Sequence, residues 1–198
     1  MPNQTDISAL SVLVVSAPYD QAVIMDGLPS DCHVEAISRL AFDLVLNELF
    51  LAEFDLIIIA AAHATQQDVA VVEQVMKERP LPIIWFVEAD DQKLAPDAIR
   101  VGTTSFVVDG LKQSRISSLV VVALERYKFI SALEVELRKS KDSLAARKIV
   151  ERAKGLLMEK RGLSEHEAYK ALRSMAMRQG KSLKSVCEAV LSMAELLP

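Results

Sequence analysis

Four short apolar runs, each bounded by polar or turn-forming residues, constrain the fold of this chain more than any other feature. They are Ser11–Val15, Leu56–Ala60, Ile83–Val87 and Ser105–Val108, with His33–Ile37 as a weaker fifth. Short runs that are apolar throughout are typical of parallel strands buried on both faces. Helical patterns lie between them, notably at Leu40–Phe50 and Asp68–Lys77. The alternation predicts an α/β domain over residues 8–128, with a five-stranded parallel sheet covered by helices.

A second region, from Ile116 to about Arg147, contains neither glycine nor proline and predicts a long helix. Its later apolar residues follow heptad-like spacings of 3, 4 and 7, although Ser140 and Arg147 occupy two positions of the seam. We expect residues 129–146 to form a dimeric coiled coil, because balanced Glu, Lys and Arg flank the seam. The alternative is a long helix half-buried on its own domain. The predicted dimer contacts are Ile130, Leu133, Leu137 and Leu144.

Residues 147–198 predict three short helices in one compact unit. The first continues the long helix and ends at Gly162, because glycine commonly follows a helix C-terminus. The second begins at Ser164, which forms a capping box with Glu167, and ends at Gly180, while Ser182 begins the third. The apolar residues expected in the core of this unit are Ile149, Ala153, Leu156, Leu157, Met158, Ala168, Leu172, Met175, Ala176, Met177, Leu183, Val186, Val190, Leu191 and Ala194.

Charge differs sharply between the two ends of the chain, whose net charge is −4. Residues 1–128 carry 9 Lys/Arg and 18 Asp/Glu, whereas residues 147–198 carry 11 Lys/Arg and 6 Glu. Any single basic residue is as well explained by a solvated helix surface. As a group, however, a net +5 on a segment without Asp favours binding to phosphates.

Four stretches of the basic tail carry a resemblance to a known family: Glu151 to Met158, Arg161 to Ser164, Glu167 to Tyr169, and Leu172 to Met177. The tail resembles an ANTAR domain, the RNA-binding antitermination module of bacterial NasT/AmiR-like regulators. Cys187 stands where that family usually has Ala, a change that packing should tolerate. The resemblance implies binding to hairpins of a leader transcript. The residues expected to contact RNA are Lys154, Arg161, Tyr169, Lys170, Arg173, Lys181 and Lys184. For Tyr169, the only aromatic residue of the tail, a partly buried packing role is favoured over a base-stacking one.

The α/β domain resembles a response-regulator receiver, the flavodoxin-like (CheY-like) fold, but lacks the residues of phosphate chemistry. A phosphorylated receiver needs acidic residues after strand 1, Asp after strand 3, Thr or Ser after strand 4 and Lys after strand 5. The residues at these positions are Ser16 and Ala17, Ala60, Val87, and Asp109, and Gly110 replaces the usual Pro. Without the carboxylates, the domain cannot hold a divalent cation. Without the Asp nucleophile no acyl phosphate forms, and without the Lys nothing pairs the charge of a phosphoryl group. We therefore expect a pseudoreceiver.

Several classes of function are not expected from this sequence. Cys32 and Cys187 are isolated thiols, which disfavours zinc or a disulfide framework and favours a cytoplasmic location. His33, His63 and His166 have no partners at metal-ligand spacing. No signal peptide, membrane-length apolar run, glycine-rich phosphate loop or nucleophile motif occurs, so neither an enzyme nor a cofactor is expected.

The sequence therefore predicts an RNA-binding transcription antitermination regulator of a nitrate- or nitrite-assimilation type of operon. It is expected to act as a homodimer on leader-transcript hairpins, under the control of a small-molecule-sensing partner protein. One alternative is an interaction scaffold or anti-regulator whose basic tail binds protein. Another is a phosphorelay that uses Asp20 or Asp109 as acceptor.

Overall fold

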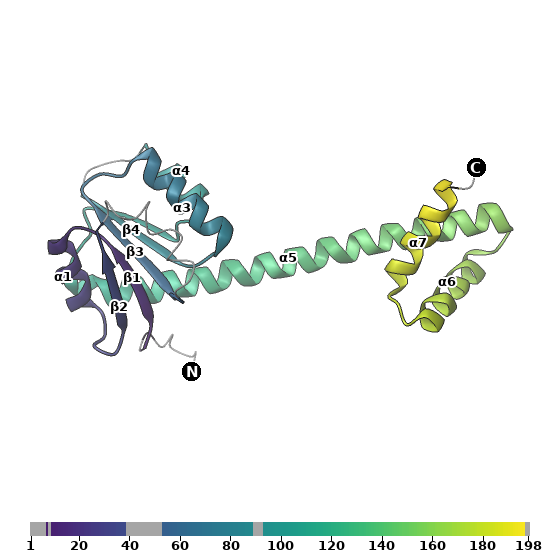
Figure 1. Ribbon diagram of the computed structural model, residues 1–198, viewed down its shortest axis with the longest axis horizontal. Coiled ribbons are helices and arrows are strands. Elements are labelled where there is room, and N and C mark those ends of the chain that lie inside the picture. The colour runs from purple at the N-terminus through teal and green to yellow at the C-terminus, as the bar shows by residue number, and fades with distance from the viewer. Residues whose placement is uncertain (1–6, 8, 39–52, 89–92, 197–198) are drawn as a thin grey trace. The chain divides into compact units, whose positions relative to one another are not determined.

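A computed structural model describes residues 7, 9–38, 53–88 and 93–196, drawn in colour in Figure 1. It divides into two compact units, Met1–Ser131 and Ala132–Pro198. Each unit has its own buried core. The predicted helix at Leu40–Phe50 lies outside the described residues.

The first unit is built on a five-stranded parallel sheet, in which all five predicted strands are confirmed (Figure 1). The strand order is β2-β1-β3-β4-β5, with neighbours paired in parallel throughout. This is the flavodoxin-like order, in which the chain reverses direction across the sheet beside β1. The strands are β1 (Ser11–Val15), β2 (His33–Ile37), β3 (Leu56–Ala61), β4 (Ile83–Val87) and β5 (Ser105–Val108).

Alternate residues of the central strands enter two separate cores, one on each face of the sheet. Ile57 and Trp85 lie in one cluster, whereas Ile58 and Phe86 lie in the other. Every residue of β3 and β4 is buried, which explains why both read as uninterrupted apolar runs. In the edge strand β2, only Val34 and Ile37 are partly buried and the other three residues are exposed, which explains its weaker signal.

Helices cover both faces of the sheet. Residues of α3 (Gln66–Glu78) and α4 (Ala95–Arg100) join the first cluster, and residues of α1 (Pro18–Gly27) and α5 (Gln113–Arg161) join the second. The predicted helix at Asp68–Lys77 is confirmed within α3, and the long helix within α5. Two helices, α1 and α4, were not among the named predictions.

The second unit contains the three helices that the tail predicted: the end of α5, α6 (Glu165–Gln179) and α7 (Leu183–Leu196). Gly162 and Gly180 adopt left-handed backbone, with φ of 65° and 62°, as the predicted helix ends require. The capping box at Ser164 is present, and Ser182 Oγ accepts the Ser185 N–H at 3.1 Å.

The core of the second unit is small. Its centre consists of Ala153 from α5, Leu172 from α6 and Cys187 from α7, all with no solvent exposure. Burial of Cys187 agrees with the expectation that its thiol is tolerated, and burial raises the pKa of that thiol. The prediction of a core position is wrong for two residues. Met177 is 75% exposed and Met158 is 40% exposed, because both point away from the packed faces of their helices.

Candidate nucleic-acid interface and receiver pocket

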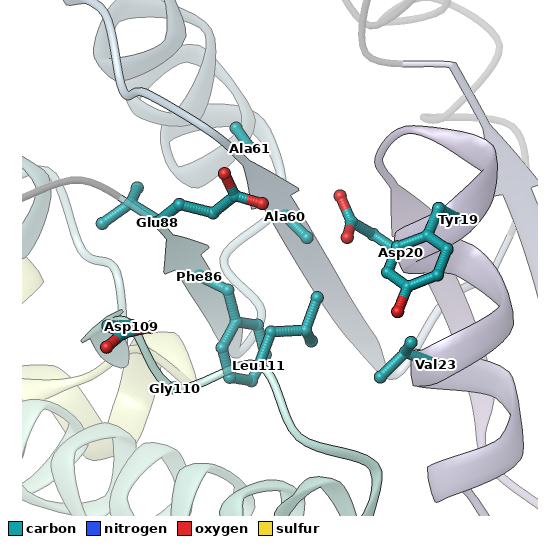
Figure 2. A pocket seen from close by; sticks show the side chains of 11 residues that line it. Tyr19, Asp20, Val23, Ala60, Ala61, Phe86, Glu88, Asp109, Gly110 and Leu111 are labelled. Carbon is teal, nitrogen blue, oxygen red and sulfur yellow. The ribbon is translucent and has the colours of Figure 1, made fainter.

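A cavity of about 330 Å³ lies at the carboxyl ends of the central strands, shown in Figure 2. In parallel α/β sheets, this edge is where ligands and reacting groups are held. Side chains from α1, from the ends of β3 and β4 and from the loop after β5 form its wall. The lining residues are Tyr19, Asp20, Val23, Ala60, Ala61, Phe86, Val87, Glu88, Asp109, Gly110 and Leu111.

Three of the five predicted receiver positions meet at this cavity. Ala60 lies near the end of β3, Val87 ends β4, and Asp109 follows β5 with its N–H donating to the Val87 carbonyl at 2.8 Å. Ser16 and Ala17 do not line the cavity. Ser16 is buried, and its carbonyl accepts a hydrogen bond from Gln21 Nε2 at 3.1 Å. The amide of Gln21 thus occupies the end of β1, where a receiver presents its acids.

The charge of the cavity is negative. Among the described lining residues, Asp20, Glu88 and Asp109 are acidic and none is basic. Figure 2 shows the carboxylates of Asp20 and Glu88 pointing toward one another across the end of β3. Burial and the charge of Glu88 raise the pKa of Asp20. Sequence reasoning missed Glu88, although its place directly after a buried strand was a usable signal.

The glycine at position 110 is explained by the side chain of Val107, which lies close to it. A Cβ built at this position would lie 2.2 Å from Cγ1 of Val107, so any side chain there would displace Val107. A proline carries that Cβ as well. The loop after β5 therefore follows a path on which the usual receiver proline does not fit.

Among the residues that the structure describes, no group of three or more His, Cys, Asp or Glu side chains is placed to hold a metal ion. Within the same residues, no helix is both long and apolar enough to cross a membrane.

In the tail, six of the seven residues predicted to contact RNA are exposed: Arg161, Tyr169, Lys170, Arg173, Lys181 and Lys184. Lys184 Nζ lies 3.8 Å from Glu188 Oε1, a loose pair on an exposed helix. Lys170 and Arg173 form no ion pair with the described side chains of the tail. These cations are available to a polyanion.

Lys154 is the exception, and its predicted role in RNA contact is not supported by its position. Its side chain is only 9% exposed, and Nζ lies 2.6 Å from Glu165 Oε1 and 2.8 Å from Glu151 Oε2. Hydrogen bonds to Glu151 and Glu165 raise the pKa of Lys154, and Lys154 lowers the pKa of Glu165. Lys154 therefore connects the end of α5 to the first turn of α6.

The acidic residues at the start of α6 are both engaged in the fold. Glu165 pairs with Lys154, and Glu167 accepts hydrogen bonds from the Ser164 N–H at 2.9 Å and its hydroxyl at 2.6 Å. Past Glu167, α6 has no acidic residue. Both carboxylates also lie at the positive end of the helix dipole. The remaining charge of α6 is consequently positive.

The predicted dimer seam on α5 is exposed to solvent. Ile130, Leu133, Leu137 and Leu144 are between 45% and 55% exposed. Among the residues that the structure describes, these four form an exposed apolar row at heptad spacing.

Two of the similar proteins are transcriptional or nitrate regulators. Residues 138–191 match the ANTAR domain family. The chain is 30% identical over 137 residues to the transcriptional regulatory protein PdtaR of Mycobacterium tuberculosis (strain CDC 1551 / Oshkosh), covering 69% of this chain and 67% of that protein. It is 36% identical over 67 residues to the nitrate regulatory protein of Klebsiella oxytoca, covering 34% of this chain and 17% of that protein.

Solved structures of receivers share the fold. The signal receiver domain of a modulated diguanylate cyclase from Desulfovibrio desulfuricans G20 matches with a TM-score of 0.50 and 16% identity, over 62% of this chain and 98% of that chain. NtrX from Brucella abortus matches with a TM-score of 0.52 and 22% identity, over 73% of this chain and 34% of that chain. With the receiver fold, the ANTAR match and the similarity to PdtaR, the chain belongs to the ANTAR-domain response regulators.

Proposed function

We propose that this protein is an RNA-binding transcription antitermination regulator that grips leader-transcript hairpins with its basic tail. The observation that carries the proposal is the disposition of charge in the tail. Glu151, Glu165 and Glu167 are held by neighbouring groups, whereas Lys170 and Arg173 are exposed. Each phosphate neutralised by such a cation releases counterions and strengthens binding.

The functional division that we propose is a pseudoreceiver over residues 8–128, a coiled-coil helix over 129–146 and an ANTAR RNA-binding domain over 147–198. Control without aspartyl phosphorylation is supported by the pocket. Ala60 and Ala61 stand at the end of β3, and the described lining residues contain no cation to pair a phosphoryl group. Three carboxylates there would also repel one. We expect beryllofluoride and acetyl phosphate to leave the oligomeric state and RNA affinity unchanged.

We propose that a partner protein which senses a small molecule controls the tail in the cytoplasm. We propose nitrate or nitrite assimilation as the regulated process, and the Klebsiella oxytoca relative, named a nitrate regulatory protein, supports a link to nitrate. Pull-down from host lysate, with and without nitrate or nitrite, tests for such a partner. A capture that does not respond to either ion would contradict this part of the proposal.

Dimerisation through α5 is supported by charge as well as by the apolar seam. With Ile130, Leu137 and Leu144 at heptad position a, Glu136 falls at position g and Lys141 at position e. In a parallel, in-register pair, g of one helix lies beside e of the next heptad on the other. Glu136 of each copy then faces Lys141 of the other, which favours the parallel arrangement.

The dimer is tested by sedimentation of the full chain. Leu137→Lys should give monomers, because it places like charges in the centre of the seam. Glu136→Lys alone should weaken the dimer, and adding Lys141→Glu should restore it by exchanging the two charges. If none of the three variants changes the sedimentation of the dimer, the interface lies elsewhere.

RNA binding is tested by titrating the full chain into a two-hairpin leader RNA at several salt concentrations. Arg173→Ala with Lys184→Ala should weaken binding at least tenfold and reduce the salt slope by about 2, since each phosphate contact contributes about 1. Lys77→Ala with Arg100→Ala removes the same charge from the first unit and should leave the slope unchanged. Salt-independent binding, or equal losses in both double variants, would overturn the proposal.

A further inference from the structure

The cavity at the carboxyl ends of the strands attracts cations but is not arranged for a metal ion. Its three acidic side chains come from three separate elements (Figure 2): Asp20 from α1, Glu88 after β4 and Asp109 after β5. Among the residues that the structure describes, these carboxylates do not form a group that could hold a metal ion. A cation that uses more than one of them must therefore be larger than a metal ion.

No described side chain neutralises these carboxylates. The ion pairs of the described residues in the first unit join other side chains, and Asp20, Glu88 and Asp109 take part in none of them. Arg115 lies near Gly110 but is not among the residues that line the cavity. Because the carboxylates of Asp20 and Glu88 point toward one another, a positive charge between them would stabilise both ionised forms.

The rest of the cavity wall is apolar and includes two aromatic rings. Phe86 is buried in the core on that face of the sheet, and Leu111 packs against the same core. Tyr19 is 80% exposed, so its ring is free to meet a ligand. A ring face attracts a cation within about 6 Å of its centre. The volume of about 330 Å³ lies at the lower end of the range of small-molecule pockets, about 300–1,000 Å³. The apolar wall would be unused by an inorganic ion but covered by a molecule with an apolar body.

We propose that this cavity binds a small organic ammonium ion, a primary amine on a short apolar body. The nitrogen lies between the carboxylates of Asp20 and Glu88, which accept hydrogen bonds from its N–H groups. The body packs against Phe86 and Leu111, and the ring of Tyr19 covers it from the solvent side. The proposal concerns the first unit alone and does not depend on RNA binding by the tail.

The test is calorimetric titration of the full chain with phenethylamine. A cacodylate buffer is used, because buffers such as Tris are themselves primary amines. Phenethyl alcohol offers the same body without the charge, and methylammonium offers the charge without the body. We expect phenethylamine to bind about tenfold or more tightly than either, since a hydrogen bond to a charged group adds about 1.5–3 kcal/mol. Magnesium chloride, titrated separately, tests the inorganic cation.

Two exposed positions allow the site to be altered without disturbing the core. Glu88→Gln keeps the size of the side chain and should weaken phenethylamine binding about tenfold or more. Tyr19→Ala should weaken it about two- to fivefold through loss of the ring. The matched control is Asp26→Asn, which removes an exposed acid of α1 that does not line the cavity, and it should bind phenethylamine as the wild type does.

Each contrary outcome identifies what is wrong with the proposal. Equal binding of phenethyl alcohol would show that the carboxylates play no part, and equal binding of methylammonium would show that the apolar wall plays none. Equal losses in Glu88→Gln and Asp26→Asn would assign the effect to the net charge of the unit. Binding of magnesium that depends on Glu88, without binding of phenethylamine, would make the cavity a metal site. All four results overturn the ammonium site and leave the proposed RNA binding, measured separately, unaffected.

Discussion

Two acidic side chains of the first unit, Asp20 and Glu88, face a cavity, whereas two in the second unit, Glu165 and Glu167, are held by neighbouring groups. In the pocket, burial and the facing carboxylate of Glu88 raise the pKa of Asp20. Glu165 and Glu167 instead complete an ion pair and a helix cap. The charge that a unit offers to a partner is therefore not its formal net charge. It is the charge of those side chains that are not already engaged in ion pairs or helix caps within the fold.

The two units also differ in the depth of their cores. The sheet of the first unit is packed on both faces, around fully buried residues such as Trp85 and Ile58. The second unit is centred on three fully buried side chains, one from each helix. A unit with so small a core depends heavily on each contact. The comparison of the two units gives four predictions, in order of decreasing effect.

The largest effect is expected from Leu172→Ala, which should cost about 2–5 kcal/mol and unfold the tail selectively. Trp85 is the only tryptophan and lies in the first unit, so its fluorescence reports that unit alone. Thermal unfolding should show early loss of helical circular dichroism with an unchanged Trp85 transition. Met177→Ala, on the exposed side of the same helix, should change stability by less than about 0.5 kcal/mol. A Trp85 transition that shifts with the helices would show that the units unfold together.

Next in size is Lys154→Met, which leaves Glu165 without its partner while keeping the buried stem of the side chain. We expect a lower melting temperature of the tail and weaker RNA binding with an unchanged salt slope, since no phosphate contact is removed. Lys160→Met, an exposed residue on the same helix, is the control for lost charge. A reduced salt slope in Lys154→Met would instead return Lys154 to the RNA interface.

The ion pair also predicts a smaller, pH-dependent effect. Because the pKa of Glu165 is lowered in the folded tail, its stabilisation is complete above the ordinary Glu pKa and is lost as pH falls through the lowered value. Glu165→Gln should therefore destabilise the tail at pH 7 and flatten its acid unfolding. Glu159→Gln makes the same charge change on the exposed side of α5 and should leave the curve as in the wild type.

The smallest effect is expected from Asp20→Asn, and its sign is opposite. The raised pKa of Asp20 means that the folded state disfavours its ionised form, so the cost is complete above that pKa and disappears as pH falls toward the ordinary value. The variant should melt slightly higher at pH 7 and like the wild type in acid. Asp26→Asn, an exposed acid on the same helix, provides the comparison, and an equal gain there would assign the effect to net charge.

Much of the fold was predictable, because local rules decide it. Strands buried on both faces read as apolar runs, and Ser164 with Glu167 marks a helix start by chemistry alone. The missed helices lack such signals: α1 buries only Ile24, and α4 has six residues, too few to show a period. Among the site residues, the burial of Lys154 could not be predicted, because its partner Glu165 is on another helix. The exposure of Met177 depends on how α6 is rotated against its neighbours, and spacing alone does not fix that angle.

Burial of Cys187 makes the second unit open to kinetic measurement. A maleimide or iodoacetamide probe reaches this sulfur only when the three helices separate. In a Cys32→Ser background, the labelling rate therefore measures transient opening of the tail. Any ligand that binds only the closed bundle slows this labelling by the factor 1 + [L]/Kd. The buried thiol thus gives a direct measure of ligand occupancy in solution, without a label attached to the ligand.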